Sequence, residues 1–306
     1  MNKAAQLIKE RLPQLQIKED LSLATCTSFR TGGPADVAAY PETAQELAAL
    51  LKVCKGEGIP FYILGNGTNV LAPDEGFRGV IVLTAGMREV SVDAESATAV
   101  AGAGVLLSTL AGECAKASLT GLEFAKGIPG SVGGAVVMNA GAYGGEIKDC
   151  LVSATVMAAD GDEPFEMSRD ELDLGYRHSI IPERGLVVLG ARFKLTTGDK
   201  DSIYAQMEEL AGRRRDKQPL EFPSAGSTFK RPEGYFAGKL IEDAGLKGFT
   251  VGGAQVSEKH AGFVINKGGA TSADILMLIK EVQKRVFENS GVMLETEVKI
   301  LGNAIT

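Results

Sequence analysis

The pentapeptide GNGTN at 65–69 has the residue types of an anion-binding loop, and it directly follows an apolar run at 61–64. Consecutive Gly and Asn residues readily take positive φ, which can point successive backbone N–H groups at one phosphate. Taken alone, the pentapeptide fits an ordinary Asn-Gly turn between strands better than a phosphate site. It is not a GxGxxG dinucleotide loop, because the next apolar run, at 80–83, indicates a strand and not a helix.

A second segment with chemical potential is GLEFAKGIPGSVGGAVVMNAGAYGG at 121–145, which has eight glycines among apolar residues. Side chains such as Leu122, Phe124, Ile128 and Val136 give it too much to bury for a flexible linker. Glycine among buried apolar residues indicates backbone that lies close to another backbone or to a flat ligand. A tight crossing of a helix over a sheet is the alternative explanation.

The composition excludes several classes of protein. The chain has 306 residues, 44% of them hydrophobic, with a net charge of -7, so it can bury a large core and lacks the basic footprint of a nucleic-acid binder. No stretch approaches the ~20 apolar residues of a membrane helix, and the N-terminus lacks the apolar core of a secretory signal. The four cysteines lie far apart and there are only two histidines, so we expect no metal site and reduced thiols in a cytoplasmic protein.

Hydrophobic periodicity predicts mixed helices and strands around these segments. Capping-box spacings at Thr43 and Glu46, Ser168 and Glu171, and Thr271 and Asp274 each indicate the start of a helix. Helices are predicted at about 4–12, 43–56, 104–114, after 168, at 199–210, 240–245 and 271–291. Strands are predicted at about 37–40, 61–64, 80–83, within 88–105, at 152–158, 186–195 and 293–301.

A polar stretch at 196–200 marks a change in the composition of the sequence. We place a domain boundary there, with a first domain at 1–198, divided into subdomains of about 1–84 and 85–198, and a second domain at 199–306. The last strand, about 293–302, can pack back on the first domain.

Several stretches, in this order and spacing, resemble the UDP-N-acetylenolpyruvoylglucosamine reductase family. They are TSFRTGGPADVAAYPET (27–43), YILGNGTNVL (62–71) with GFRGVIV (76–82), GIPGSVGGAVVMNAGAYGGEI (127–147), and AGSTFKRP (225–232) with LETEVKILG (294–302). The similarity runs from about Leu21 to Gly302. The short length and the KHAGFVIN stretch at 259–266 resemble the compact subtype, which lacks an extra loop in the substrate domain.

The resemblance implies a fold and a reaction. The fold is α+β: the two-subdomain FAD-binding fold of the vanillyl-alcohol-oxidase type, followed by a C-terminal α+β substrate domain. NADPH would reduce FAD, and the flavin N5 would pass hydride to the β carbon of UDP-N-acetylglucosamine enolpyruvate, giving UDP-N-acetylmuramate for peptidoglycan synthesis. The partner is then a small nucleotide sugar, without nucleic acid or membrane, and we expect a monomer.

Three catalytic residues follow from the family's motifs. Hydride addition next to a carboxylate builds negative charge that needs cationic or hydrogen-bond donors, and the α carbon then needs a proton. Arg177 would hold the substrate carboxylate, Ser227 would donate the proton, and Glu297 would be the acidic partner.

From the pattern alone, each of these residues has a simpler explanation. Arg177 could pair with Asp170 or Asp173. Ser227 could make a local turn bond. Glu297 shares the polar face of the last strand with Glu295 and could be solvated.

The resemblance also assigns binding residues. FAD would be held without a covalent link by Gly65, Asn66, Gly67, Thr68, Asn69, Gly127, Pro129, Gly130, Ser131, Gly133, Gly134, Asn139, Ala140 and Gly141. The nucleotide sugar would contact Tyr176, Lys217, Arg231 and His260. His260 stands where the larger subtype has Gln, and Arg231 stands where it has Asn, so these two contacts differ in chemistry from that subtype.

Two other functions compete with this one. The first is a different flavin oxidase or dehydrogenase on the same FAD fold; the fit of 225–232 and of Glu297, outside the FAD domain, speaks against it. The second is a flavin- or nucleotide-sugar-binding module without catalysis, which the joint presence of Arg177, Ser227 and Glu297 disfavours.

Overall fold

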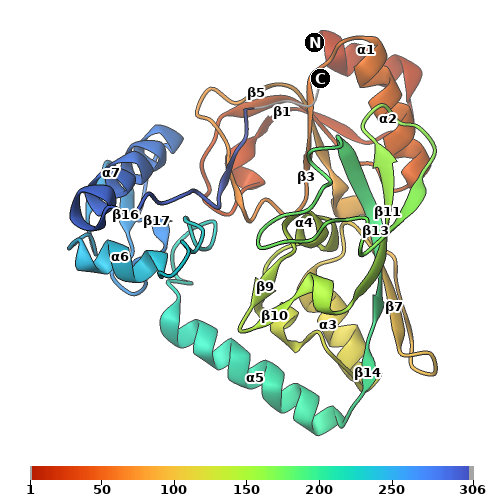
Figure 1. Cartoon of the computed structure of the whole chain (residues 1–306). Helices are drawn as coiled ribbons and strands as arrows, with labels where there is room; N and C mark the ends of the chain where they lie inside the picture. The colour runs from red at the N-terminus through yellow and green to blue at the C-terminus, as the bar shows by residue number, and fades with distance from the viewer. Residues whose placement is uncertain (1, 303–306) are drawn as a thin grey trace.

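The structure is a computed structural model that describes residues 2–302 and consists of three lobes, of which the second and third are linked by one long helix (Figure 1). Residue 1 and residues 303–306, the outer ends of the two predicted domains, lie outside the described residues. Among the described residues, no helix is long and apolar enough to span a membrane.

The first lobe is a four-stranded sheet covered by two helices. Its elements are α1 (Lys3–Arg11), β1 (Ile17–Ser22), β2 (Pro34–Ala39), α2 (Ala44–Gly56), β3 (Phe61–Leu64), β4 (Val70–Leu71) and β5 (Phe77–Leu83). The strand order is β1-β2-β5-β3, with β2, β5 and β3 parallel and β1 antiparallel to β2. Helix α2 begins as predicted, since the Thr43 hydroxyl accepts from Glu46 N–H at 3.1 Å, and it buries Leu47, Leu50 and Leu51.

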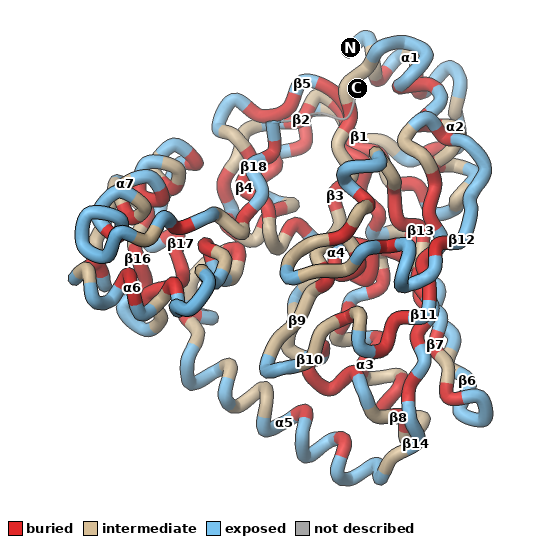
Figure 2. Tube along the Cα trace, viewed as in Figure 1, coloured by how far each residue is buried: buried red, intermediate tan, exposed pale blue. Residues whose placement is uncertain are grey.

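The second lobe is a five-stranded antiparallel sheet of order β12-β11-β13-β7-β6. Its elements are β6 (Val90–Asp93), β7 (Thr98–Gly102), α3 (Leu107–Lys116), β8 (Leu119–Thr120), α4 (Val132–Met138), β9 (Gly141–Ala142), β10 (Gly145–Glu146), β11 (Leu151–Ala158), β12 (Phe165–Ser168), β13 (Leu186–Lys194) and β14 (Thr196–Thr197). Helices α3 and α4 bury Leu107, Leu110, Val132 and Val136 in one core with the sheet, the red interior of this lobe in Figure 2.

The third lobe is a three-stranded antiparallel sheet packed against two helices. Its elements are α6 (Ala237–Asp243), β15 (Thr250–Val251), β16 (Ala254–Val256), β17 (Val264–Asn266) and α7 (Ser272–Ser290), and the last strand of the chain, β18 (Lys299–Ile300), lies on the first lobe. Helix α7 has the full predicted capping box of Thr271 and Asp274, and it ends at Gly291 with φ +72°. Its buried face includes Ile275, Leu278 and Val282.

Helix α5 (Lys200–Lys217) crosses from the second lobe to the third (Figure 1). Ile203 and Met207, near its start, are part of the second lobe's core. The helix continues beyond its predicted end at residue 210, and its last turn has the basic residues Arg214, Arg215 and Lys217. The chain then returns from the third lobe to the first, where β18 pairs in parallel with β4. The division at residue 198 stays a prediction, and these two crossings are the contacts that bear on it.

Two further predicted elements are wrong in extent. Ser168 and Glu171 make their reciprocal contacts, with the Glu171 carboxylate 2.8 Å from Ser168 N, but only one helical turn follows, because Asp173 takes φ +46°. The strand predicted at 293–301 is regular only at Lys299–Ile300; before it, Phe229 and Thr296 form an isolated antiparallel bridge.

Candidate active site

Arg177 and Glu297, which lie 120 residues apart in the sequence, form an ion pair in the interior between the lobes. Arg177 Nε donates to Glu297 Oε1 at 2.7 Å, and the two side chains are only 19% and 13% exposed. Arg177 Nη2 also donates to the carbonyl of Gly141 at 3.2 Å. The structure therefore brings together two predicted catalytic residues and one residue of the glycine-rich segment.

The turn that carries Arg177 sets its direction. Gly175 and His178 exchange backbone hydrogen bonds, and Arg177 between them takes φ +55°, a strained region for a residue other than glycine. The simpler pairing of Arg177 with Asp170 or Asp173 is wrong, because Asp170 pairs with Arg169 and Asp173 lies beside His178. Backbone strain of this kind persists where the surrounding contacts over-determine it.

Glu297 is largely covered, with its side chain 13% exposed, although its strand pattern predicts a solvated side chain. Its neighbour on the predicted face, Glu295, is 73% exposed and pairs with Lys230. The exposures of Glu295 and Glu297 differ because 293–298 is not a regular strand. Residues two apart therefore need not point to the same face. Burial raises the pKa of the Glu297 carboxyl, and the positive charge of Arg177 opposes that rise without cancelling it.

Ser227 lies beside this pair on an irregular segment. Gly226 before it takes φ +75° with open space around its α carbon, and the Ser227 side chain is exposed. The segment after it runs antiparallel to the chain around Glu297: Glu297 N donates to Thr228 O at 2.8 Å, and Lys230 N donates to Glu295 O at 2.9 Å. Ser227 is thus placed one residue from the contact that holds Glu297.

Thr228 is a residue that the sequence analysis missed. It is fully buried, donates its N–H to Gly262 O at 2.9 Å and accepts from Val264 N with its hydroxyl at 3.0 Å. These bonds fix the backbone on which Ser227 stands. Nothing in the sequence distinguishes Thr228 from other threonines, since its partners lie more than 30 residues away.

The two glycine-rich segments meet. The Asn66 amide donates to Pro129 O at 2.5 Å, and a methyl group at Gly65 would lie 2.5 Å from Ser131 Oγ. Gly67 has φ +62°, and a side chain there would collide with the Cys26 carbonyl. Glycine is therefore required at 67, whereas a side chain at 65 would displace the Ser131 hydroxyl. The loop at 65–69 lies against residues 129–131.

The residues at this meeting point fit a phosphate-bearing cofactor such as FAD. Three hydroxyls around the loops, those of Ser28, Thr31 and Ser131, are buried without a hydrogen-bond partner in the part of the chain that the structure describes. A buried hydroxyl without a partner is costly, and phosphate oxygens would accept from it. Gly130 and Gly134 leave space on the same side, since a methyl group at either position would have no atom nearer than 3.7 Å.

Other residues of the glycine-rich segment pack against protein. A methyl group at Gly133 would lie 2.9 Å from the Ala103 side chain. The backbone N–H of Ala140 donates to the carbonyl of Ala135, and its carbonyl accepts from the N–H of Ile147. Asn139 is fully buried with φ +41°. Its side-chain NH2 donates to the Glu146 carboxylate and the Gly175 carbonyl, and its side-chain oxygen accepts from the N–H of Lys148. The alternative of a tight backbone crossing thus describes part of this segment.

The predicted substrate residues come from the third lobe and the segment before it, from the turn around Tyr176 and from the end of α5. Arg231 N donates to the Tyr176 hydroxyl at 3.1 Å, and the Arg231 guanidinium lies 4.1 Å from the centre of the Phe236 ring. Lys217 ends α5 and is exposed. The hydrogen bond between Arg231 and Tyr176 therefore joins the segment that carries Ser227 to the turn that carries Arg177.

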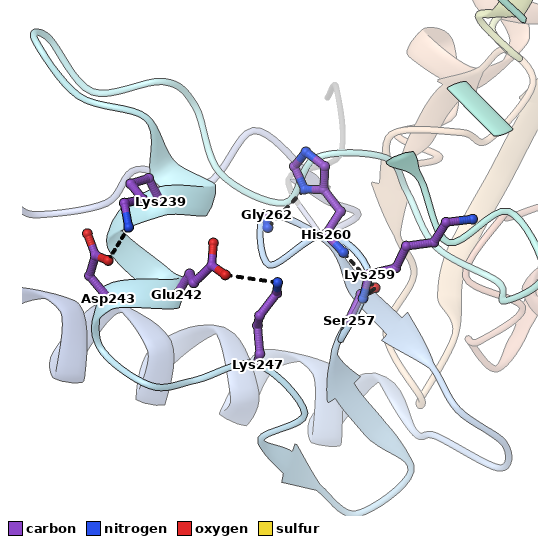
Figure 3. Close-up of polar contacts among 8 residues, drawn as sticks. All are labelled: Lys239, Glu242, Asp243, Lys247, Ser257, Lys259, His260 and Gly262. Carbon is purple, nitrogen blue, oxygen red and sulfur yellow. Dashed lines mark hydrogen bonds and ion pairs between the residues drawn. The ribbon is translucent and has the colours of Figure 1, made fainter. Parts of the chain in front are cut away.

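His260 lies on the third lobe, next to the start of α6 (Figure 3). Its Nδ1 accepts from Gly262 N at 3.1 Å, so Nε2 carries the hydrogen of the neutral ring. Burial, with the nearby charges of Lys247 and Lys217, lowers the pKa of His260, which keeps the ring neutral at physiological pH. His260 is therefore suited to donate a hydrogen bond from Nε2, as the amide NH2 of a Gln would.

Arg214, one turn before Lys217, was also missed. It is half-buried on α5, and a methyl group at Gly127 would lie 3.3 Å from its Cδ, so it flanks the glycine-rich segment. The sequence shows only a basic run there, whereas the helix turns Arg214 inward between the exposed Arg213 and Arg215. The helical position of each basic residue is the signal that could have distinguished Arg214 from its neighbours.

Comparisons with known proteins give a consistent result over the whole chain. Residues 218–301 match the family description "UDP-N-acetylenolpyruvoylglucosamine reductase, C-terminal domain", and residues 35–163 match "FAD binding domain". The chain is 56% identical to the UDP-N-acetylenolpyruvoylglucosamine reductase of Agathobacter rectalis over 96% of its length and 97% of that protein, and 53% identical to that of Clostridium novyi over 95% and 94%.

A solved structure is similar in the same way. The crystal structure of UDP-N-acetylenolpyruvylglucosamine reductase from Thermus caldophilus superimposes with a TM-score of 0.81 at 36% identity, covering 94% of this chain and 100% of that one. The similarity extends over all three lobes and is not limited to the part that fits FAD.

Proposed function

Because the chain belongs to the UDP-N-acetylenolpyruvoylglucosamine reductase family, we propose that Arg177, Ser227 and Glu297 carry out its reaction. The enzyme is an FAD-dependent reductase that uses NADPH to convert UDP-N-acetylglucosamine enolpyruvate to UDP-N-acetylmuramate. The predicted family, α+β fold class, activity and cofactors are confirmed, in preference to another flavin oxidase.

The observation that carries the proposal is the largely covered Arg177–Glu297 pair beside Ser227. FAD, when bound, supplies the hydride that adds to the β carbon of the enolpyruvyl group. Gly65, Gly67, Thr68, Gly130 and Ser131 would hold its diphosphate side, where the buried hydroxyls are without partners.

Arg177 binds and polarises the substrate carboxylate. Glu297 engages Nε and the Gly141 carbonyl engages Nη2, so the guanidinium plane is fixed with Nη1 left for the substrate. Charge that develops on the carboxylate during hydride addition is stabilised by this preorganised cation. Ser227, exposed beside the pair, then delivers the proton to the α carbon.

The nucleotide sugar is held by Tyr176, Lys217, Arg231 and His260, and we propose diphosphate contacts for the cationic members. Lys239 and Lys247, close to His260, already have the acidic partners Asp243 and Glu242 (Figure 3). The active site is assembled from a single chain, which supports a monomer, and the nucleotide-sugar substrate supports a cytoplasmic location.

The colour of the protein tests this function. The purified protein should be yellow, and anaerobic NADPH should bleach it. Adding UDP-N-acetylglucosamine enolpyruvate to the bleached protein without oxygen should restore the flavin absorbance. A colourless protein, or one that NADPH does not bleach, would contradict the function, and recovery with oxygen alone would indicate an oxidase.

The pH dependence of turnover tests the role of Glu297. Its carboxylate orients Arg177, and burial raises its pKa, so as pH falls through that raised value protonation breaks the pair and kcat should fall. Glu297→Gln should remove this acid limb, because an amide does not titrate. Stopped-flow reoxidation of the reduced enzyme by the sugar, measured against pH, gives the comparison; an acid limb that persists in the Gln variant would assign it to another group.

A further inference from the structure

The peptide of Glu297 is held from both sides by different lobes. Its N–H donates to Thr228 O at 2.8 Å, and its C=O accepts from Asn69 Nδ2 at 3.1 Å across 228 residues of sequence. Two residues on, Lys299 N donates to Asn69 O at 3.0 Å. Asn69 thus clamps the segment 297–299 with both its side chain and its backbone.

Asn69 is the last residue of the pentapeptide predicted to bind FAD, yet its amide has this partner inside the protein. The orientation of the amide is determined by chemistry, because the Glu297 carbonyl can only accept and must face the NH2 group. Asn66, three residues earlier, has a different partner. Its side-chain NH2 donates to the carbonyl of Pro129, on the glycine-rich segment, and not to the chain around Glu297. One loop therefore carries two asparagines with separate tasks.

We propose that Asn69 is a positioning residue, which ties the cofactor loop to Glu297 and thereby fixes Arg177. The proposal rests on the proposed function for the roles of Arg177 and Glu297. The Glu297 carboxylate reaches Arg177 Nε at 2.7 Å from a segment that is not a regular strand. The isolated bridge between Phe229 and Thr296 holds one side of this segment, and the Asn69 amide holds the carbonyl of Glu297 on the other. Displacements of about 1 Å can slow a reaction severely when they move a group that orients the substrate.

The same tie affects the titration of Glu297. The charged groups that face its carboxyl are Arg177, Lys230 and Lys299, all of which oppose the effect of burial on its pKa. If the segment moves away from Arg177, the largest of these opposing charges is lost. Loss of the Asn69 contact should therefore shift the acid limb of the sugar half-reaction to higher pH.

The test uses the holoenzyme saturated with FAD and the variants Asn69→Ala and Asn69→Asp. Ionised aspartate has the size of asparagine but cannot donate to the Glu297 carbonyl, so the reoxidation rate of this variant separates the hydrogen bond from packing. Its negative charge would itself raise the pKa of Glu297, so the acid limb is compared in Asn69→Ala. We expect both variants to slow reoxidation by UDP-N-acetylglucosamine enolpyruvate about tenfold, while reduction by NADPH stays within about twofold. In Asn69→Ala the acid limb of reoxidation should also shift to higher pH.

The matched control is Asn66→Ala, in the same loop. It should change the FAD dissociation constant of the apoprotein without moving the acid limb. Thermal unfolding of each apoprotein by circular dichroism reports whether the variants fold; if Asn69→Ala does not fold, the isosteric Asn69→Asp carries the test.

Three outcomes would overturn the proposal. In the first, the Asn69 variants keep wild-type reoxidation and acid limb. In the second, they weaken FAD binding as Asn66→Ala does and lose both half-reactions equally, so that Asn69 acts only on the cofactor. In the third, Asn69→Asp behaves as wild type, so that only the volume of the side chain matters. Failure of the wild-type enzyme to be reoxidised by the sugar would instead contradict the proposed function itself.

Discussion

Replacing Ser227 by alanine is expected to slow reoxidation of the reduced enzyme by the sugar about 10²–10⁴-fold, the range that a positioned proton donor contributes. Reduction by NADPH should stay within about twofold of wild type, because Ser227 is exposed and, within residues 2–302, the hydrogen bonds that anchor its segment do not involve its side chain. The backbone is held by buried Thr228, so the substitution should leave Glu297 and Arg177 in place. Rapid mixing of each half-reaction separately measures the two effects.

The control for Ser227 is Ser224→Ala, three residues earlier on the same irregular segment. That variant should match wild type in both half-reactions. If Ser227→Ala slows both half-reactions equally, the defect lies in folding or FAD binding. If it slows neither, the proton comes from another group, and solvent-isotope effects on the α-carbon proton would then be the route to it.

Replacing Arg177 by lysine is expected to lower kcat for the sugar by about 10²–10³-fold, comparable to removing one preorganised donor from a site that stabilises developing charge. Lysine keeps the positive charge but not the planar fork. A single ammonium cannot bond the Glu297 carboxylate and the Gly141 carbonyl at their observed positions and also hold the substrate carboxylate. Single-turnover reoxidation measured over a range of sugar concentrations separates a loss of binding from a loss of rate.

The control for Arg177 is Arg169→Lys, on the same stretch of chain. Arg169 is exposed and pairs with Asp170 at 3.3 Å, a surface contact of little energetic weight. We expect no measurable change in either half-reaction. If Arg177→Lys retains wild-type kcat, the guanidinium geometry is dispensable and only the charge contributes.

Local signals in the sequence predicted the elements whose determinants are local. Helix α7 has its capping box at Thr271 and Asp274 and its left-handed Gly291, and it forms where the pattern placed it. The same spacing at Ser168 and Glu171 gave only one turn, because Asp173 leaves the helical region. A capping signal specifies how a helix can start, and the residues after it and the tertiary contacts decide whether it continues.

The catalytic residues could be named from the sequence only through the family resemblance. No periodicity predicts that Arg177 and Glu297 meet, since their contact depends on how the second lobe docks against the segment that follows α7. The exposure of Glu295 and the burial of Glu297 also follow from tertiary structure, because an irregular segment does not alternate its sides. Thr228 and Asn69 act through backbone atoms of distant residues, for which sequence patterns give no signal.

The large sequence separation of these contacts affects the stage of folding at which the active site forms. Each lobe can collapse on local contacts, but the Arg177–Glu297 pair closes a loop of 120 residues and the Asn69–Glu297 bond closes one of 228. Contacts between residues so distant in sequence carry the largest loop-closure entropy and form late. The chemistry is thus absent from every partly folded form of the chain, so a molecule with its helices and sheets formed but its lobes undocked contains all the catalytic side chains and no active site.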